Sequence, residues 1–177
     1  MIKTKLILFG VVLLSLFYLT VLYFALNPNV SVAYSEYYIH NSTMFYNQKV
    51  PDMLLPLGKS LSVKMLMPYF SREGWSKQSI KDENALLLNK GSLIFNLNST
   101  SKVEIFNFQF SQVNHPITVF FTIAGQRFIK LLMPSDVGLI SLNVPNALLS
   151  HRFDKVNTLT LCSSSPVSLM NLMVKEL

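Results

Sequence analysis

The stretch ITVFFTIAGQRFIKLLM, residues 117–133, holds two runs rich in β-branched and aromatic residues on either side of Gly125. Residues of these types favour strands. Two such runs separated by a short turn that contains glycine predict a β-hairpin. We therefore expect strands over 117–124 and 126–133, joined at Gly125.

Short apolar runs of the same kind recur after residue 35, separated by turn residues. We expect further strands at 36–46, 60–67, 85–97 (broken at Lys90-Gly91), 102–110, 138–144, 156–162 and 167–174. Prolines punctuate the second half too often for long helices, which leaves room for one helical turn at 146–150. The pattern predicts an all-β domain, a β-sandwich of about eight strands with jelly-roll or Greek-key connections.

Residues 6–26, LILFGVVLLSLFYLTVLYFAL, form an apolar run without a single charge. A helix rises 1.5 Å per residue, so this run is long enough to cross a hydrocarbon core of about 30 Å. Lys3 and Lys5 precede it, and basic residues mark the cytoplasmic side of a span. We expect a single-pass protein of the bacterial inner membrane with this domain order: a cytoplasmic N-terminus at 1–5, a transmembrane anchor at 6–26, a linker at 27–35 and an extracytoplasmic domain at 36–177.

The alternative is a cleaved signal peptide, for which Ser31-Val32-Ala33 offers a small-x-small cleavage site. The apolar region of a signal peptide is about 7 to 15 residues long. The run at 6–26 is longer, which favours an uncleaved anchor.

Charge and cysteine content restrict the partners of the exported part. Apart from the two N-terminal lysines, 13 basic residues face 9 acidic ones, a net charge of +4. The basic residues are scattered singly, whereas nucleic-acid and polybasic lipid sites need clustered cations; we expect no nucleic-acid partner. Cys162 is the one cysteine, so no intrachain disulfide forms, which fits a bacterial envelope better than a eukaryotic secretory route.

No catalytic or metal-binding motif stands out. His40, His115 and His151 lie far apart in the sequence, without the spacing of a metal site. We expect Cys162 to be a small buried apolar residue of its strand. The chain has no Gly-x-Ser-x-Gly elbow, no glycine-rich phosphate loop and no distinctive pair of carboxylates. We expect no cofactor, no metal and no catalytic residues; the alternative is an envelope hydrolase or transferase whose site no motif marks.

The stretch LGKSLSVKMLMPYFSREGWS at 57–76 is followed by a strand ending LIFNL, by the two runs around 124–126, and by LISLNVPNALL and NTLTLCSSSP. This order resembles the galactose-binding-like jelly-roll accessory domain of bacterial envelope-polysaccharide and phosphoglycerol transferases, over about residues 55–170. The family motif resembles Gly-Trp-Ser-x-x-Glu with a second Trp soon after. Gly74, Trp75 and Ser76 match, but Ser79 stands at the Glu position and the chain has no second Trp. The resemblance implies a jelly-roll fold, while the missing groups are those best suited to hold a sugar.

Trp75 is the best candidate for a ring that stacks on a sugar, and the candidate ligand-binding residues are Trp75, Arg72 and Gln78. The alternative is that Trp75 packs between the sheets and Gly74 makes a tight turn; we expect this packing role. The function predicted from the sequence is a membrane-anchored, non-catalytic β-sandwich. We expect it to bind a glycan or a partner membrane protein in the bacterial cell envelope, and an accessory subunit of a glycan-transfer system is the kind of protein that this function predicts.

Overall fold

A computed structural model describes the chain except residues 1, 28, 100, 136–137 and 152–154. The chain forms two compact units, Met1–Val30 and Ser31–Leu177. The first unit is the helix α1 (Ile2–Leu26), whose apolar segment Ile7–Leu26 has no buried residue and is long enough to cross a membrane. A signal sequence near the N-terminus can also form an apolar helix that meets this minimum length. The hydroxyls of Ser15 and Thr20 donate to carbonyls four residues earlier, so both are satisfied within the helix.

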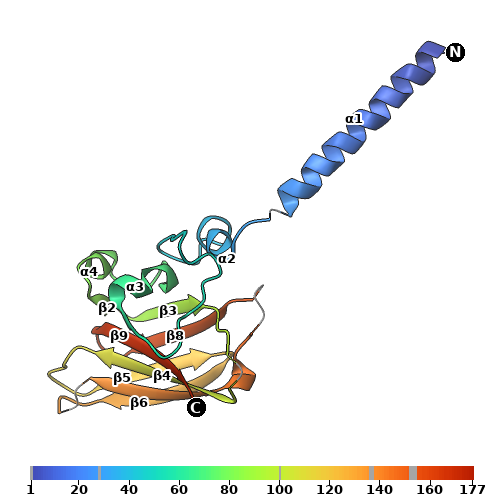
Figure 1. Cartoon of the computed structure of the whole chain (residues 1–177). Coiled ribbons are helices and arrows are strands. Elements are labelled where there is room, and N and C mark those ends of the chain that lie inside the picture. The colour runs from blue at the N-terminus through green and yellow to red at the C-terminus, as the bar shows by residue number, and fades with distance from the viewer. Residues whose placement is uncertain (1, 28, 100, 136–137, 152–154) are drawn as a thin grey trace. The chain divides into compact units, whose positions relative to one another are not determined.

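The second unit is a sandwich of two antiparallel sheets (Figure 1). The first sheet has the order β1 (Ser60–Ser62), β9 (Val167–Glu176), β4 (Val103–Phe110), β7 (Leu139–Pro145), and β2 (Ala85–Leu87) also pairs with β9. The second sheet has the order β3 (Lys90–Phe95), β8 (Asn157–Ser163), β5 (Ile117–Ile123), β6 (Gln126–Leu132). The predicted all-β sandwich is thus confirmed.

The strand pairs are nested around one turn. β5 pairs with β6, β4 with β7, β3 with β8, and β2 with β9, and these pairs alternate between the two sheets. A further pair in each sheet joins one of these strand pairs to the next: β4 pairs with β9 in the first sheet, and β5 pairs with β8 in the second. This is a long hairpin rolled into a sandwich, which is the jelly-roll connection.

The turn at the centre of the nest is the predicted hairpin. Ile123 pairs with Gln126, so the loop has only two residues, Ala124 with φ 47° and Gly125 with φ 82°. Two positive φ angles define a type I′ turn, whose twist matches that of the flanking strands.

The core lies between the sheets. Side chains alternate between buried and more exposed positions along β4, β5 and β7, because successive residues of a strand point to opposite faces. The rings of Phe108 on β4 and Phe121 on β5 lie 4.8 Å apart and join the two sheets. Each fully buried Phe stabilises the fold by about 1.5 to 3 kcal/mol relative to exposing it.

Residues 31–84, called the cap from here on, are mostly not strand. They contain the helical turns α2 (Val32–Tyr34), η1 (Ser35–Ile39), α3 (Val63–Leu66), η2 (Met67–Tyr69) and α4 (Lys77–Lys81), with β1 between η1 and α3. Figure 1 shows α3 and α4 beside the sandwich near β2 and β3, and contacts join α4 to β2 and η2 to β3.

The predicted strand at 36–46 is wrong, because this segment turns to bring tyrosine rings together. The rings of Tyr34 and Tyr38, one helical turn apart, lie 4.6 Å from each other, and both meet the ring of Tyr46. Contact between rings four residues apart needs a helical turn, since in a strand the two side chains would share a face but lie about 13 Å apart.

The predicted strand at 60–67 is wrong beyond Ser62. Val63 and Leu66 are both buried on one face of α3, and Pro68 favours the tight turn of η2 that follows. The strand predicted over 85–97 breaks at residues 88–89 rather than at Lys90-Gly91, since the Leu88 N–H donates to Gly74 O at 2.9 Å. The single helical turn expected at 146–150 is η3 (Asn146–Leu148).

Candidate functional site

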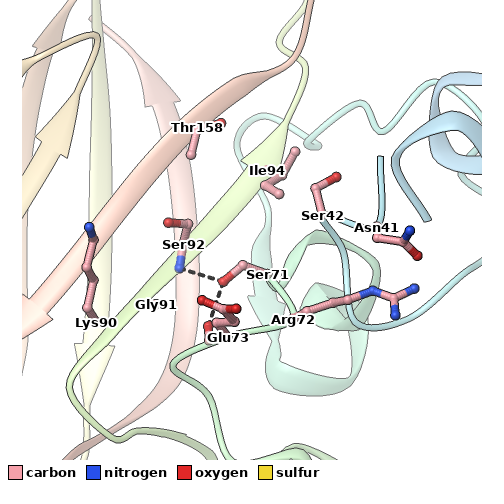
Figure 2. A pocket seen from close by; sticks show the side chains of 10 residues that line it. All are labelled: Asn41, Ser42, Ser71, Arg72, Glu73, Lys90, Gly91, Ser92, Ile94 and Thr158. Atoms are coloured by element: carbon pink, nitrogen blue, oxygen red, sulfur yellow. Dashed lines mark hydrogen bonds between the residues drawn. The ribbon is translucent and has the colours of Figure 1, made fainter. Parts of the chain in front are cut away.

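A polar hollow of about 470 Å³ lies where the cap meets β3 (Figure 2). The cap contributes two short segments, and the strands β3 and β8 form the other wall. The lining residues are Asn41, Ser42, Ser71, Arg72, Glu73, Lys90, Gly91, Ser92, Ile94 and Thr158. Most of these side chains are polar, in contrast to the apolar lining that is usual for small-molecule pockets.

Backbone pairing fixes the floor of the hollow. The Ser71 N–H donates to Ser92 O at 2.9 Å, and the Ser92 N–H donates to Ser71 Oγ at 2.8 Å. Ser71 Oγ in turn donates to Glu73 O at 2.9 Å, as the dashed lines in Figure 2 show. The cap and β3 therefore hold each other in one register at this point.

The guanidinium of Arg72 is held in a fixed orientation. Its Nε donates to Thr43 O and its Nη2 donates to Tyr37 O, both at 3.0 Å. Its carbon lies 5.1 Å from the centre of the Tyr37 ring, a cation–π contact. A planar group with two of its donors engaged keeps its remaining edge oriented without further loss of side-chain entropy.

Opposite charges flank the hollow without pairing. Glu73 and Lys90 are both exposed and both line the hollow. Among the residues that the structure describes, the one ion pair is Lys64 with Glu83, at 3.6 Å. The hollow therefore presents separate acceptor and donor groups, which suits a ligand carrying several hydroxyls.

Trp75 lies behind the hollow rather than in it. Only 4% of its surface is exposed, its Nε1 donates to Ser92 O at 3.2 Å, and its ring packs 4.7 Å from that of Phe70. A Cβ at Gly91 would come within 2.4 Å of Nε1, so the strand passes directly over the ring. The buried ring supports the wall of the hollow and has no free face for stacking on a sugar.

The other two sequence candidates have different positions. Arg72 lines the hollow. Gln78, on α4, donates to the carboxylate of Asp82 on the exposed side of that helix and is not among the lining residues. Ser71, Ser92, Lys90 and Thr158 were missed, since nothing in the sequence shows that the segments carrying them are neighbours.

Two further sequence expectations concern reactive side chains. Cys162, expected to be buried, is half-buried on the outer face of β8, opposite Lys90 and Phe120. Within the described part of the chain, no three His, Cys, Asp or Glu side chains gather in a way that could hold a metal ion.

Comparisons with known proteins identify no family. No family model and no curated protein matches the chain. One similar solved structure is a family GH115 4-O-methyl-alpha-glucuronidase with specificity for decorated arabinogalactans, at 11% identity and a TM-score of 0.43 over 55% of this chain and 15% of that one. Another contains the M60 catalytic domain and the CBM51-1 and CBM51-2 domains of ZmpB from Clostridium perfringens, at 10% identity and a TM-score of 0.31 over 52% of this chain and 11% of that one. Both TM-scores are below 0.5, so neither likeness identifies a ligand for this chain.

Proposed function

We propose that the sandwich binds a saccharide in the hollow between the cap and β3, while α1 holds it at a bacterial envelope membrane. The observation that carries the proposal is the set of oriented polar groups around one opening of about 470 Å³: Arg72, Glu73, Lys90 and the hydroxyls of neighbouring serines. Sugar hydroxyls both donate and accept hydrogen bonds, so they match a wall that offers both.

We infer that this binding is not accompanied by catalysis. Canonical glycoside hydrolases use two carboxylates on opposite sides of the scissile bond. Glu73 is the one acidic side chain among the described residues that line the hollow. The protein should therefore leave a bound oligosaccharide intact, and release of new reducing ends on prolonged incubation would contradict this.

A saccharide panel titrated against the full chain in neutral detergent tests the proposal. Glu73→Gln removes one acceptor charge from the hollow and should weaken binding about tenfold, or about 1.4 kcal/mol. Glu176→Gln makes the same chemical change at an exposed position of β9 outside the hollow and should leave the affinity unchanged. The proposal fails if no saccharide binds, or if the two variants behave alike.

The orientation is part of the same proposal: the sandwich lies outside the cytoplasm, because lysines precede the apolar helix. Alkaline phosphatase fused after Leu177 should be active, and a reporter that fluoresces only in the cytoplasm should be dark at the same point. The reverse pair of results would overturn the orientation without bearing on saccharide binding.

A further inference from the structure

The outer face of the second sheet carries another depression, of about 280 Å³, beside the hollow. All four strands of that sheet contribute to it. Its lining residues are Lys90 of β3, Phe120 and Thr122 of β5, Arg127 of β6, and Thr160 and Cys162 of β8. The register brings them together, since Cys162 pairs with both Lys90 and Phe120, and Thr122 pairs with both Thr160 and Arg127.

The guanidinium of Arg127 lies over an aromatic ring in this depression. Its guanidinium carbon lies 4.1 Å from the centre of the Phe120 ring, a close cation–π contact. A guanidinium carries its N–H donors along the edge of a planar group, where they can engage two oxygens of one anion at the same time.

The other lining groups complete a site for an anion. Lys90 supplies a second cation, and Thr122 and Thr160 supply hydroxyls. Thr160 Oγ1 is already placed by its hydrogen bond with Ser92 Oγ at 2.9 Å. None of the described lining residues is acidic, so the charge of the depression is positive and favours a carboxylate or a phosphate.

We propose that this depression binds the carboxylate or phosphate group of an acidic glycan whose neighbouring units occupy the hollow. Lys90 lines both the hollow and the depression. One glycan that crosses the strands from β3 towards β6 would therefore occupy the two sites together. The inference rests on the proposed saccharide function for the ligand's remaining units, but the anion site itself does not.

The simpler explanation is that Arg127 only covers the half-buried Phe120 ring on the sheet. In that case Arg127→Gln would lower the melting temperature slightly and leave affinity for acidic ligands unchanged. Lys130→Gln is the matched control, because it removes the same charge from the same strand. The two positions are three residues apart in sequence, an odd offset, so their side chains lie on opposite faces of the strand.

The experiment titrates the full chain in neutral detergent at low salt with four probes. These are inorganic phosphate, a short oligogalacturonate, a short poly(glycerol phosphate), and a neutral galactose oligosaccharide of matched length. Arg127→Gln should weaken the tighter of the two acidic oligomers about tenfold or more and leave the neutral one unchanged, because a charged hydrogen-bonding partner is lost. Lys130→Gln should change no affinity more than about twofold. The acidic oligomer that binds more tightly identifies carboxylate or phosphate as the natural group.

Each failure has a separate meaning. Equal effects of Arg127→Gln and Lys130→Gln, or equal affinities for acidic and neutral oligomers, would overturn the anion site. Failure of phosphate and both acidic oligomers to bind would also overturn it, whatever the neutral oligosaccharide does. Phosphate that shifts the Arg127 side-chain NMR signals and loses affinity in Arg127→Gln, without binding of any saccharide, would sustain the anion site and reject the saccharide function.

Discussion

The cap and the rolled hairpin of β3 to β9 are held together in different ways. In the roll, long antiparallel ladders pair every strand with at least one neighbour over several residues, and the contact between the Phe108 and Phe121 rings joins the two sheets. The cap joins the sandwich through the short strand β1, which pairs with β9, through isolated bridges such as Phe70 with Leu93, and through side chains such as Leu61 and Leu66 that are buried in the same core.

A few side chains anchor the cap to backbone groups. Trp75 donates to Ser92 O, and Asn96, just after β3, donates to Asp52 O, so both bonds join the cap to the sandwich. Tyr69 donates to Leu54 O within the cap itself. The roll is thus held by continuous ladders, whereas the cap is held by buried side chains together with separate hydrogen bonds of this kind. The hollow is built from both regions, so its shape depends on these separate contacts as well as on the ladders.

The largest expected effect is that of Trp75→Ala. Loss of a buried aromatic side chain costs about 3 to 5 kcal/mol, and here a hydrogen bond to β3 is lost as well. A denaturant melt of the full chain measures it, and hydrogen exchange shows where it acts. Amides of the cap and β3 should exchange faster than those of β4 and β5. Trp75→Phe, which keeps the ring packing, should cost less, and a Trp75→Ala protein as stable as the parent would contradict the anchoring role.

The next prediction compares alanine substitutions at two glycines with similar φ angles, one in the cap and one in the roll. Gly74 has φ 85° and Gly125 has φ 82°, so alanine at either suffers the left-handed strain of about 1 to 2 kcal/mol. At Gly74 the new Cβ would also lie 1.6 Å from Lys90 O, whereas nothing lies within 4 Å at Gly125. Gly74→Ala should therefore cost more than about 3 kcal/mol and Gly125→Ala only the strain. Equal melting temperatures of the two variants would refute the close approach at Gly74.

The third prediction concerns the stability of the protein at high pH, where Tyr69 of the cap ionises. Burial raises the pKa of Tyr69 from 10.0 to about 12, so the unfolded chain releases this proton at a lower pH than the folded one. The contribution of the neutral phenol to the free energy of unfolding is thus fully present below pH 10 and is lost as the pH rises to about 12. Over that interval the parent should lose about 2 to 3 kcal/mol more stability than Tyr69→Phe, which cannot ionise. Parallel stability curves for the two proteins would contradict the burial of this hydroxyl.

The smallest expected effect is a gain, at the turn of the roll. Ala124 has φ 47°, a conformation that asparagine tolerates better than alanine, and Asn-Gly is a preferred pair for a type I′ turn. Ala124→Asn should raise the free energy of unfolding by about 0.5 to 1 kcal/mol, as measured by the denaturant midpoint. Ala124→Val, with a β-branched side chain at the same angle, should lower it; a gain from both would point to a cause other than backbone conformation.

The difference between the regions also explains what sequence patterns could predict. The hairpin at 117–133 and the strands of the second half follow from alternating apolar residues and a glycine turn, which act between near neighbours in sequence. In the cap, β-favouring residues such as Tyr37 and Tyr38 form a helical turn instead, because contacts of their rings with each other and with Tyr46 outweigh strand propensity.

The candidate binding surfaces could be predicted from the sequence less well than the strands. Trp75 and Arg72 were recognised as notable from the motif around them, but the sequence could not decide that the ring packs inward while the guanidinium lines the hollow. Lys90 and Arg127 stand on strands far apart in the chain, and neither lies in a recognisable motif. Period-two alternation in the sequence determines which residues of each strand point outward. Only the nested strand order, selected by packing of the whole core, decides that those of β3, β8, β5 and β6 share one face.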